Sequence, residues 1–227
     1  MYKLIKNKIK IKLLSKQDDI LAKLNLSVFK FTTYLPYSKS SLNYSSLSSL
    51  LNDVVINNRR SIIEFGGGIS TVYLAKLASI TESNIKITTV DHDEVWIGLL
   101  KKILEKEGVS EYVNLIHSPL VESKKSLAKN KWYNEEIVKK NIEGLKFDQV
   151  IVDGPLAYQK AIQLSRYPAL LFINEFLNEN NAVFLDDTDR KGEKEIIKLW
   201  EKGFKRTFNK LNATSMISFS GSHFNIS

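Results

Sequence analysis

The stretch Ser61-Ile-Ile-Glu-Phe-Gly-Gly-Gly-Ile-Ser-Thr71 decides the fold of this 227-residue chain. An apolar run of β-type residues comes first, three glycines follow, and a second apolar-rich run continues through residues 72–78. This order predicts a buried strand over 61–65, a tight glycine loop, and a helix over about 69–79. Glycine lets a ligand approach the backbone closely, and the start of a helix offers free N–H groups to polar or anionic ligands.

A second strand lies at an informative distance from the glycines. Residues 85–90 have the pattern of a strand and Asp91-His92-Asp93 follows directly, so Asp91 stands 23 residues after Gly68. In nucleotide-binding βαβ units, an acidic residue about 20 residues beyond the glycines binds the ribose hydroxyls. The spacing therefore favours a nucleotide or nucleoside site. The alternative is that Asp91 only caps the following helix.

The spacing of the glycines narrows the class of ligand. The pyrophosphate fingerprint needs a third glycine where this chain has Thr71. The phosphate-loop pattern needs a lysine, and this loop contains none. A ligand without phosphates, held close to the backbone, fits the loop better.

Short apolar strands alternate with helical patterns along the rest of the chain. Further strands are expected at 113–117, 148–153, 182–186, about 204–208 and 215–220, with one helix ending near residue 57 and another over about 94–107. This alternation predicts an α/β fold: a Rossmann-like, doubly wound, mostly parallel seven-stranded sheet with helices on both faces. Ligands of such sheets bind beyond the carboxyl ends of the strands.

Five motifs occur in order along the chain: Ser70-Thr71, Asp91-His92-Asp93, Asp153-Gly154-Pro155, Arg166-Tyr167-Pro168-Ala169 and Asp186-Asp187. Together with Glu64 and the glycines, they resemble the class I S-adenosylmethionine-dependent methyltransferases, and in particular a branch of small bacterial ones. The resemblance spans residues 34–220 and implies S-adenosyl-L-methionine as cofactor. It also implies an N-terminal helical extension on the acceptor side over 1–58 and a cofactor-binding catalytic domain over 59–227, in one compact unit.

The resemblance further implies a set of cofactor-binding residues. Asp91 would accept hydrogen bonds from both ribose hydroxyls, and Ser118 would contact the adenine. Glu64 would bind the methionine ammonium or, alternatively, fix the loop by accepting backbone N–H bonds. His92 would stack on the adenine, unless it is a surface or structural residue. The expected set is Glu64, Gly66, Gly67, Gly68, Ser70, Thr71, Asp91, His92, Ser118 and Asp153.

Asp153 ends an expected strand, beside the position implied for the transferable methyl group. An alcohol must lose its proton as it attacks that methyl, and a positioned carboxylate can take the proton. We therefore expect Asp153 to be the catalytic base, with Arg190 in the catalytic set. The alternative is that the Asp153 carboxylate only binds N–H groups of the Gly154-Pro155 turn.

Asp153, Asp186 and Asp187 bring three carboxylates to neighbouring strand ends. They are similar to the metal ligands of the catechol O-methyltransferase group, which makes Mg²⁺ or Mn²⁺ a candidate cofactor. Asp187 departs from that group, which commonly has Asn at this place. The alternative is that Arg166 or Arg190 neutralises the carboxylates without a metal.

The expected acceptor is a small molecule or a glycan, with a hydroxyl of a sugar or glycan precursor as the first choice. Trp132-Tyr133 would stack on a sugar ring or, alternatively, belong to the core. Arg166 would anchor an acidic acceptor or brace the carboxylates. Two rival functions stay open: N-methylation of a small metabolite, and nucleoside binding without turnover.

Composition limits the partners. The chain has no cysteine, which excludes disulfides and thiol catalysis, and no apolar run long enough for a transmembrane helix. The net charge is +8, but the basic residues are spread out and no nucleic-acid motif is visible, so nucleic acid is not an expected partner. The lysine-rich residues 1–16 would touch a membrane surface or form an ordinary surface segment. A cytoplasmic protein is expected, with its oligomeric state left open.

Overall fold

The structure is a computed structural model that describes residues 17–226. The expected membrane contact through residues 1–16 lies outside the described residues. Within residues 17–226, no helix combines the length and the apolar character needed to cross a membrane.

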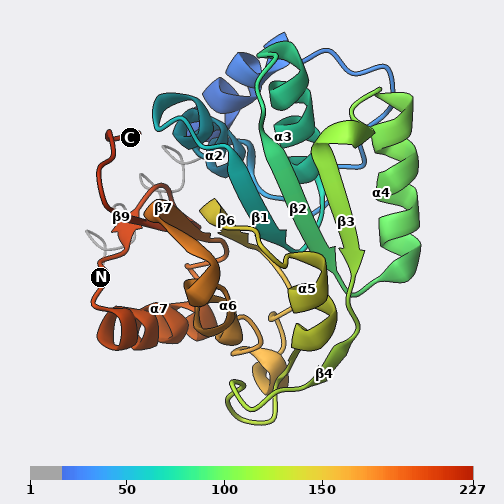
Figure 1. Ribbon diagram of the computed structural model, residues 1–227. Helices are drawn as coiled ribbons and strands as arrows, with labels where there is room; N and C mark the ends of the chain where they lie inside the picture. Colours follow the sequence, from blue (N-terminus) through green and yellow to red (C-terminus); the bar gives the residue numbers. More distant parts are fainter. Residues whose placement is uncertain (1–16, 227) are drawn as a thin grey trace.

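A seven-stranded sheet forms the centre of the molecule (Figure 1). Its strands are β1 Ser61–Phe65, β2 Lys86–Asp91, β3 Val113–His117, β6 Phe147–Val152, β7 Leu177–Leu185, β8 Asn209–Lys210 and β9 Met216–Ser220. Their order across the sheet is β3-β2-β1-β6-β7-β9-β8. Strands β3, β2, β1, β6 and β7 are parallel, whereas β9 is antiparallel to both of its neighbours. This arrangement confirms the Rossmann-like, mostly parallel sheet.

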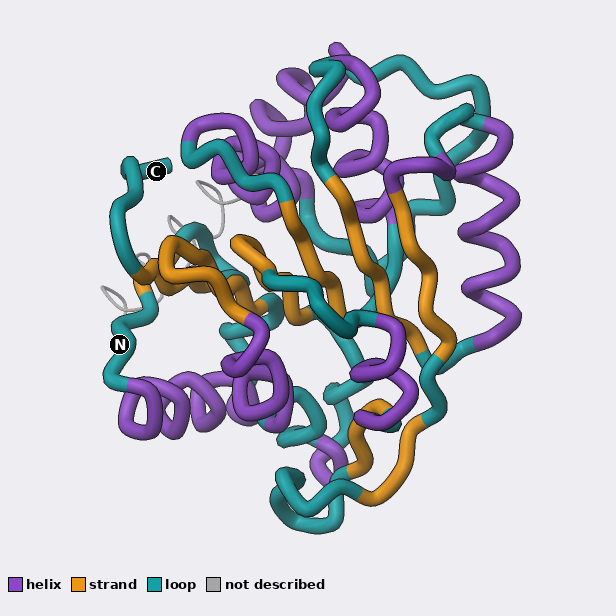
Figure 2. Tube along the Cα trace, in the orientation of Figure 1, coloured by secondary structure: helices purple, strands orange, loops and turns teal. Residues whose placement is uncertain are grey.

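Helices cover both faces of the sheet (Figures 1 and 2). The α-helices are α2 Tyr44–Ile56, α3 Ile69–Ile80, α4 Glu94–Lys106, α5 Glu135–Asn141, α6 Pro168–Ile173 and α7 Lys191–Phe204, and the 3₁₀ turns are η1 Leu26–Val28, η2 Ser110–Tyr112, η3 Lys160–Ile162 and η4 Asn174–Phe176. Successive strand residues point to opposite faces. Ile62 belongs to the core cluster built with α2 and α3, whereas its neighbour Ile63 belongs to the cluster built with α5, α6 and α7.

Most expected strands and helices lie where the sequence places them, but the sixth strand does not. The expected strand at 204–208 is wrong, because α7 continues to Phe204 and β8 starts only at Asn209. The buried side chains of Ile196, Ile197 and Trp200 keep α7 helical up to this point. Lys205, with φ of 51°, then ends the helix in the left-handed conformation.

A two-stranded hairpin outside the main sheet, β4 Leu120–Glu122 paired with β5 Lys131–Tyr133, is an element that the sequence did not predict. It carries Trp132 and Tyr133, which are 0% and 1% exposed, into the core beside Phe65. The expectation that Trp132-Tyr133 stacks on a sugar ring is therefore wrong, and the core alternative holds. A ring closed off from solvent cannot receive a sugar.

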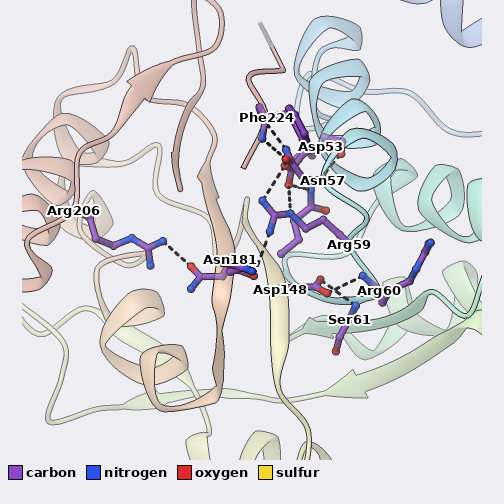
Figure 3. Close-up of polar contacts among 12 residues, drawn as sticks. Asp53, Asn57, Arg59, Arg60, Ser61, Asp148, Asn181, Arg206 and Phe224 are labelled. Carbon is purple, nitrogen blue, oxygen red and sulfur yellow. Dashed lines mark hydrogen bonds and ion pairs between the residues drawn. The ribbon is translucent and has the colours of Figure 1, made fainter. Parts of the chain in front are cut away.

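Polar contacts tie helix α2 to the amino ends of the strands (Figure 3). The buried Arg59 guanidinium donates from Nε to Asp53 Oδ2 at 3.0 Å and from Nη2 to Asp53 Oδ1 at 3.1 Å. The Asp148 carboxylate accepts the backbone N–H of Arg60 at 2.8 Å and of Ser61 at 3.0 Å. The polar groups at this end of the sheet therefore bind one another. The predicted site residues lie at the opposite end, where the strands have their carboxyl ends.

Candidate active site

A cavity of about 320 Å³ lies where β1, β2 and β6 end. The residues around it include Gly66, Gly67, Gly68, Asp91, His92 and Asp153, which the chain brings together from three strands. Another wall, ahead of α2, is formed by Pro36, Ser38, Ser40, Ser41 and Leu42. A larger hollow of about 590 Å³ beside Arg206 contains none of the predicted site residues, so the smaller cavity is the candidate active site.

Two glycines let β1 and β6 approach each other at the floor of this cavity. Gly66 has a φ of +94°, and a Cβ there would stand 2.6 Å from the backbone nitrogen of Gly154. A Cβ on Gly154 would stand 2.7 Å from the Gly66 Cα and 2.5 Å from the Tyr133 hydroxyl. The crossing therefore requires glycine at both positions.

Asp91 holds the glycine loop from the neighbouring strand. Its carboxylate accepts the backbone N–H of Gly67 at 2.9 Å and of Asp93 at 3.0 Å. The helix α4 is capped by Asp93, which accepts the N–H of Trp96 at 2.9 Å. The alternative that Asp91 caps this helix is thus wrong. Sequence reasoning missed Trp96, whose indole N–H donates to the Gly67 carbonyl at 2.7 Å and whose ring borders the cavity.

Glu64 lies fully buried beneath the loop. Its carboxylate accepts hydrogen bonds from the hydroxyls of Ser70, Thr71 and Thr89. It therefore fixes the start of α3 through side-chain hydroxyls instead of the backbone N–H groups considered above. Burial raises the pKa of Glu64 to about 7, although these hydroxyls lower it in part.

His92 and Ser118 differ in their access to the cavity. The His92 ring borders it with Nδ1 at 3.2 Å from Asp91 Oδ1, and this pairing raises the pKa of His92. Ser118 is 0% exposed and donates its hydroxyl to the Asn134 carbonyl at 3.2 Å. The cavity lining includes His92 but not Ser118.

Tyr133, which the sequence singles out only for stacking on a sugar ring, is a further residue of the cavity wall. Its hydroxyl is buried and makes no hydrogen bond within the described residues. Burial and the charges of Asp91 and Asp153 raise the pKa of Tyr133 well above its usual range, so the phenol stays protonated. It adds an unused donor beside the two glycines.

The segment from Tyr34 to Leu42 is held at both ends. Glu107 accepts the backbone N–H groups of Thr32 at 2.8 Å and Thr33 at 2.7 Å, together with both threonine hydroxyls. Although burial raises the pKa of Glu107, these bonds outweigh burial and lower it to about 2. At the other end, the Asn43 side-chain amide donates to the Thr214 hydroxyl at 2.6 Å.

The three expected carboxylates do meet beyond β6 and β7. Oxygen atoms of Asp153, Asp186 and Asp187 lie within 4.8 Å of one another. Glu193, from the first turn of α7, is a fourth acidic residue that sequence reasoning missed, because a charged residue in a lysine-rich helix has the pattern of a solvated face. Its side chain is 0% exposed and lies 3.9 Å from both Arg166 and Arg190.

Two arginines neutralise part of this charge. Arg166 lies 3.3 Å from Asp153 Oδ1 and 3.0 Å from Asp187 Oδ2, while Arg190 lies 2.8 Å from the same Asp187 oxygen. Burial and the Asp186 charge raise the pKa of Asp153 well above its usual range. Burial likewise raises the pKa of Asp186 and of Glu193 to about 7.

These residues do not fit a divalent metal centre. The carboxylate oxygens are suitable ligands for Mg²⁺ or Mn²⁺ in chemical type and spacing. However, a guanidinium that cannot lose its proton already contacts two of the three carboxylates. A dication between them would stand close to a fixed positive charge in a poorly solvated place, so no step of the chemistry is derived through a metal.

We expect the free energy of unfolding to fall between about pH 5 and pH 8. Glu64, Asp186 and Glu193 have folded-state pKa values raised to about 7, so the folded protein retains protons that the unfolded chain releases. Their stabilising contribution is complete below the unfolded pKa values and is lost as the pH rises through the raised ones. Urea unfolding at pH 5.5 and pH 8.0 measures the difference, and Glu64→Gln should reduce it. Greater stability at pH 8.0 would contradict the expectation.

Comparisons with known proteins give relatives by structure. No family model matches the chain, and no curated protein matches it in sequence. A putative caffeoyl-CoA O-methyltransferase from Staphylococcus aureus superposes with a TM-score of 0.60 at 17% identity, covering 96% of this chain and 100% of the other. A methyltransferase from Podospora anserina, solved with SAH (S-adenosylhomocysteine), gives 0.61 at 13% identity and covers 96% of each chain. An O-methyltransferase from Bacillus cereus in complex with SAH gives 0.60 at 14% identity, covering 90% of this chain and 91% of the other.

At these identities the likeness concerns the fold. The superpositions extend over nearly the whole chain, in agreement with the mostly parallel sheet and its antiparallel strand β9. The chain therefore has the Rossmann-like fold of these solved methyltransferases.

Proposed function

We propose that this protein is an S-adenosylmethionine-dependent methyltransferase. One observation carries the proposal: Gly66–Gly68, Asp91 and Asp153 border a single cavity at the carboxyl ends of β1, β2 and β6. Doubly wound sheets bind their ligands in this crevice. Structural neighbours that contain SAM or SAH support the choice of cofactor.

In this proposal the cofactor lies across the ends of β1 and β2. Asp91 binds the ribose hydroxyls with the lone pairs that its two backbone N–H bonds leave free. The His92 ring borders the adenosine half, whereas Ser118 is buried outside the cavity lining and its backbone N–H already donates to the Asp91 carbonyl at 2.8 Å. Glu64 keeps the loop in shape through Ser70 and Thr71.

Asp91→Ala is expected to weaken SAH binding by about 1.5–3 kcal/mol, because it removes a charge-assisted acceptor of the ribose hydroxyls. Isothermal titration calorimetry measures the change. Asp93→Ser is the matched control, since it removes the neighbouring carboxylate but keeps an oxygen that can cap α4. Superimposable titration curves for wild type and Asp91→Ala would refute the ribose assignment.

We further propose that the acceptor is a hydroxyl of a sugar or glycan precursor. A second cavity of about 400 Å³ supports this choice, since apolar side chains (Ile20, Ala213) and hydroxyl, amide and carboxylate side chains line it together, and none of its lining residues within 17–226 is basic: Asp18, Asp19, Asn43, Ser45, Asn212 and Thr214. One of its residues, Thr214, is linked to the chain just after the carboxylate cluster, since its carbonyl accepts the backbone N–H of Thr188 at 2.7 Å. In the segment from Tyr34 to Leu42, Tyr37 is 43% exposed and stacks on Tyr44, so it offers an aromatic face to a sugar ring. Hydroxyl, amide and carboxylate groups can all hydrogen-bond the hydroxyl groups of a polyhydroxylated acceptor.

The chemical step is a direct displacement. As the acceptor oxygen attacks the methyl carbon, its proton passes to the Asp153 carboxylate and the bond from carbon to the sulfonium sulfur breaks, leaving SAH. The sulfonium is already activated, so alignment and proton removal are what the protein has to supply. Arg190 forms an ion pair with Asp187 at 2.8 Å, so its role in this proposal is to hold the carboxylate cluster in place.

Transfer of a labelled methyl group from the cofactor tests the proposal. Neutral sugars and glycan precursors should become labelled, while small amines should not. Labelling of amines alone would favour the rival N-methyltransferase. Cofactor binding without transfer to any fraction of a cell extract would favour a nucleoside-binding protein.

A further inference from the structure

We propose that Arg166 is a resident counter-ion of the carboxylate cluster, which takes the place of a divalent cation and positions Asp153. The inference depends on the proposed function only for the role of Asp153. The state of charge in the cluster can be tested without any methyl transfer.

Backbone carbonyls fix the Arg166 guanidinium in one orientation. Arg166 is 2% exposed. Nε donates to the Pro155 carbonyl at 3.1 Å, Nη1 donates to the Asp186 carbonyl at 3.3 Å, and Nη2 donates to the Asp153 carbonyl. The group is therefore bound to the chain that follows β6 and to the chain that follows β7. It cannot swing out without leaving buried carbonyls unpaired, which is costly.

From this fixed position the guanidinium reaches the carboxylates on both sides. Nη2 lies 3.3 Å from Asp153 Oδ1, and Nη1 lies 3.0 Å from Asp187 Oδ2. A planar fork of N–H donors suits two carboxylates held at fixed places, whereas a lysine ammonium would act as a single point. With Oδ1 of Asp153 bound in this way, Oδ2 is the oxygen that remains for the acceptor proton.

Arg190 does not serve the same purpose. Its side chain is 35% exposed, and its ion pairs are with Asp187 at 2.8 Å and Glu193 at 3.9 Å. It has no contact with Asp153 among the ion pairs of residues 17–226. Solvent screens the charge of a partly exposed ion pair. We therefore assign the role of permanent counter-ion to Arg166 and not to Arg190.

The guanidinium and a dication compete for the same oxygens. The cluster has four acidic side chains and two arginines, so removing one arginine leaves more negative charge at ligand atoms that lie within 4.8 Å of one another. Arg166→Gln should therefore bind a divalent cation at these oxygens more tightly than the wild type does. Arg166→Lys keeps the charge and should not bind the cation more tightly.

Calorimetric titration with MnCl₂ alone tests the proposal on the full chain. Arg166→Gln should bind Mn²⁺ about 10- to 100-fold more tightly than wild type, from the loss of one nearby positive charge. Arg166→Lys should resemble wild type, and adding Asp187→Asn to Arg166→Gln should abolish the gain. Thermal melting of each variant identifies any that fails to fold. If Arg166→Gln does not fold, the comparison of Mn²⁺ binding between wild type and Arg166→Lys tests the proposal in its place.

Two results would overturn the proposal. One is a wild-type protein that binds a single Mn²⁺ at micromolar concentration and loses it in Asp187→Asn. The other is a folded Arg166→Gln protein with no more affinity for Mn²⁺ than wild type. Neither result depends on the cofactor, whereas a wild-type protein that binds no SAH would refute the proposed function and leave the Mn²⁺ comparison intact.

Discussion

Asp153→Asn is expected to lower methyl transfer about 10²- to 10⁴-fold with little change in cofactor affinity. The amide cannot accept the acceptor proton, but it keeps the size of the side chain and an oxygen for Arg166, which lies 3.3 Å from Asp153 Oδ1. Single-turnover rates with labelled cofactor measure the chemical step, and calorimetry with SAH measures the affinity.

Asp148→Asn is the matched control for this prediction. Asp148 lies at the other end of β6, where it accepts the backbone N–H groups of Arg60 and Ser61. The same substitution there should leave transfer unchanged. If Asp153→Asn reacts at the wild-type rate, then Asp153 is not the base, and alignment of the two substrates alone accounts for the reaction.

Gly66→Ala is expected to destabilise the fold and to abolish cofactor binding together. The Cβ would stand 2.6 Å from the Gly154 nitrogen and 2.9 Å from the Asp153 carbonyl carbon, both backbone atoms that can move only if β1 and β6 separate. The φ of +94° adds strain for any residue other than glycine. We expect the free energy of unfolding to fall by more than about 3 kcal/mol, as measured by urea unfolding.

Gly68→Val separates the two effects. Gly68 has an extended φ of −165°, and a Cβ there would meet only the Ser70 hydroxyl, at 3.8 Å. The fold should therefore lose no more than about 1 kcal/mol. The branched side chain occupies space at the cavity wall, so calorimetry should detect no SAH binding. Wild-type melting of Gly66→Ala, or wild-type affinity of Gly68→Val, would contradict this account of the loop.

The central strands β1, β2 and β6 could be predicted from the sequence because they are buried on both sides, and the more exposed edge strand β3 still has an apolar run. The strands at 61–65 and 113–117 lie as predicted, since short apolar runs bounded by turn signals leave few alternatives. The hairpin β4–β5 could not be predicted in this way, because its strands have only three residues each. Its place against Phe65 depends on tertiary packing.

The candidate site was predictable where a motif follows a strand. Asp91 and Asp153 stand at the ends of β2 and β6, the two strands on either side of β1, and do border one cavity. Contacts that depend on side-chain direction were not predictable. Ser118 follows β3 as expected, yet its hydroxyl points to the Asn134 carbonyl, and Trp96 reaches back from α4 to the glycine loop. Strand order places a residue at an edge of the sheet but does not decide which way it faces.

The segment from Tyr34 to Leu42 forms part of the cavity wall and is hydrogen-bonded at both ends, so local opening of this segment would give a ligand access to the cavity. Glu107 retains Thr32 and Thr33 at one end, and Thr214 retains Asn43 at the other. Between them, the Ser38 N–H donates to the Ser41 hydroxyl at 3.0 Å, so this turn is closed by its own atoms. Opening it breaks a few local bonds and none in the sheet. Amide hydrogens of this segment should therefore exchange at a rate that mild denaturant hardly changes, while those of β1 and β6 exchange only on global unfolding.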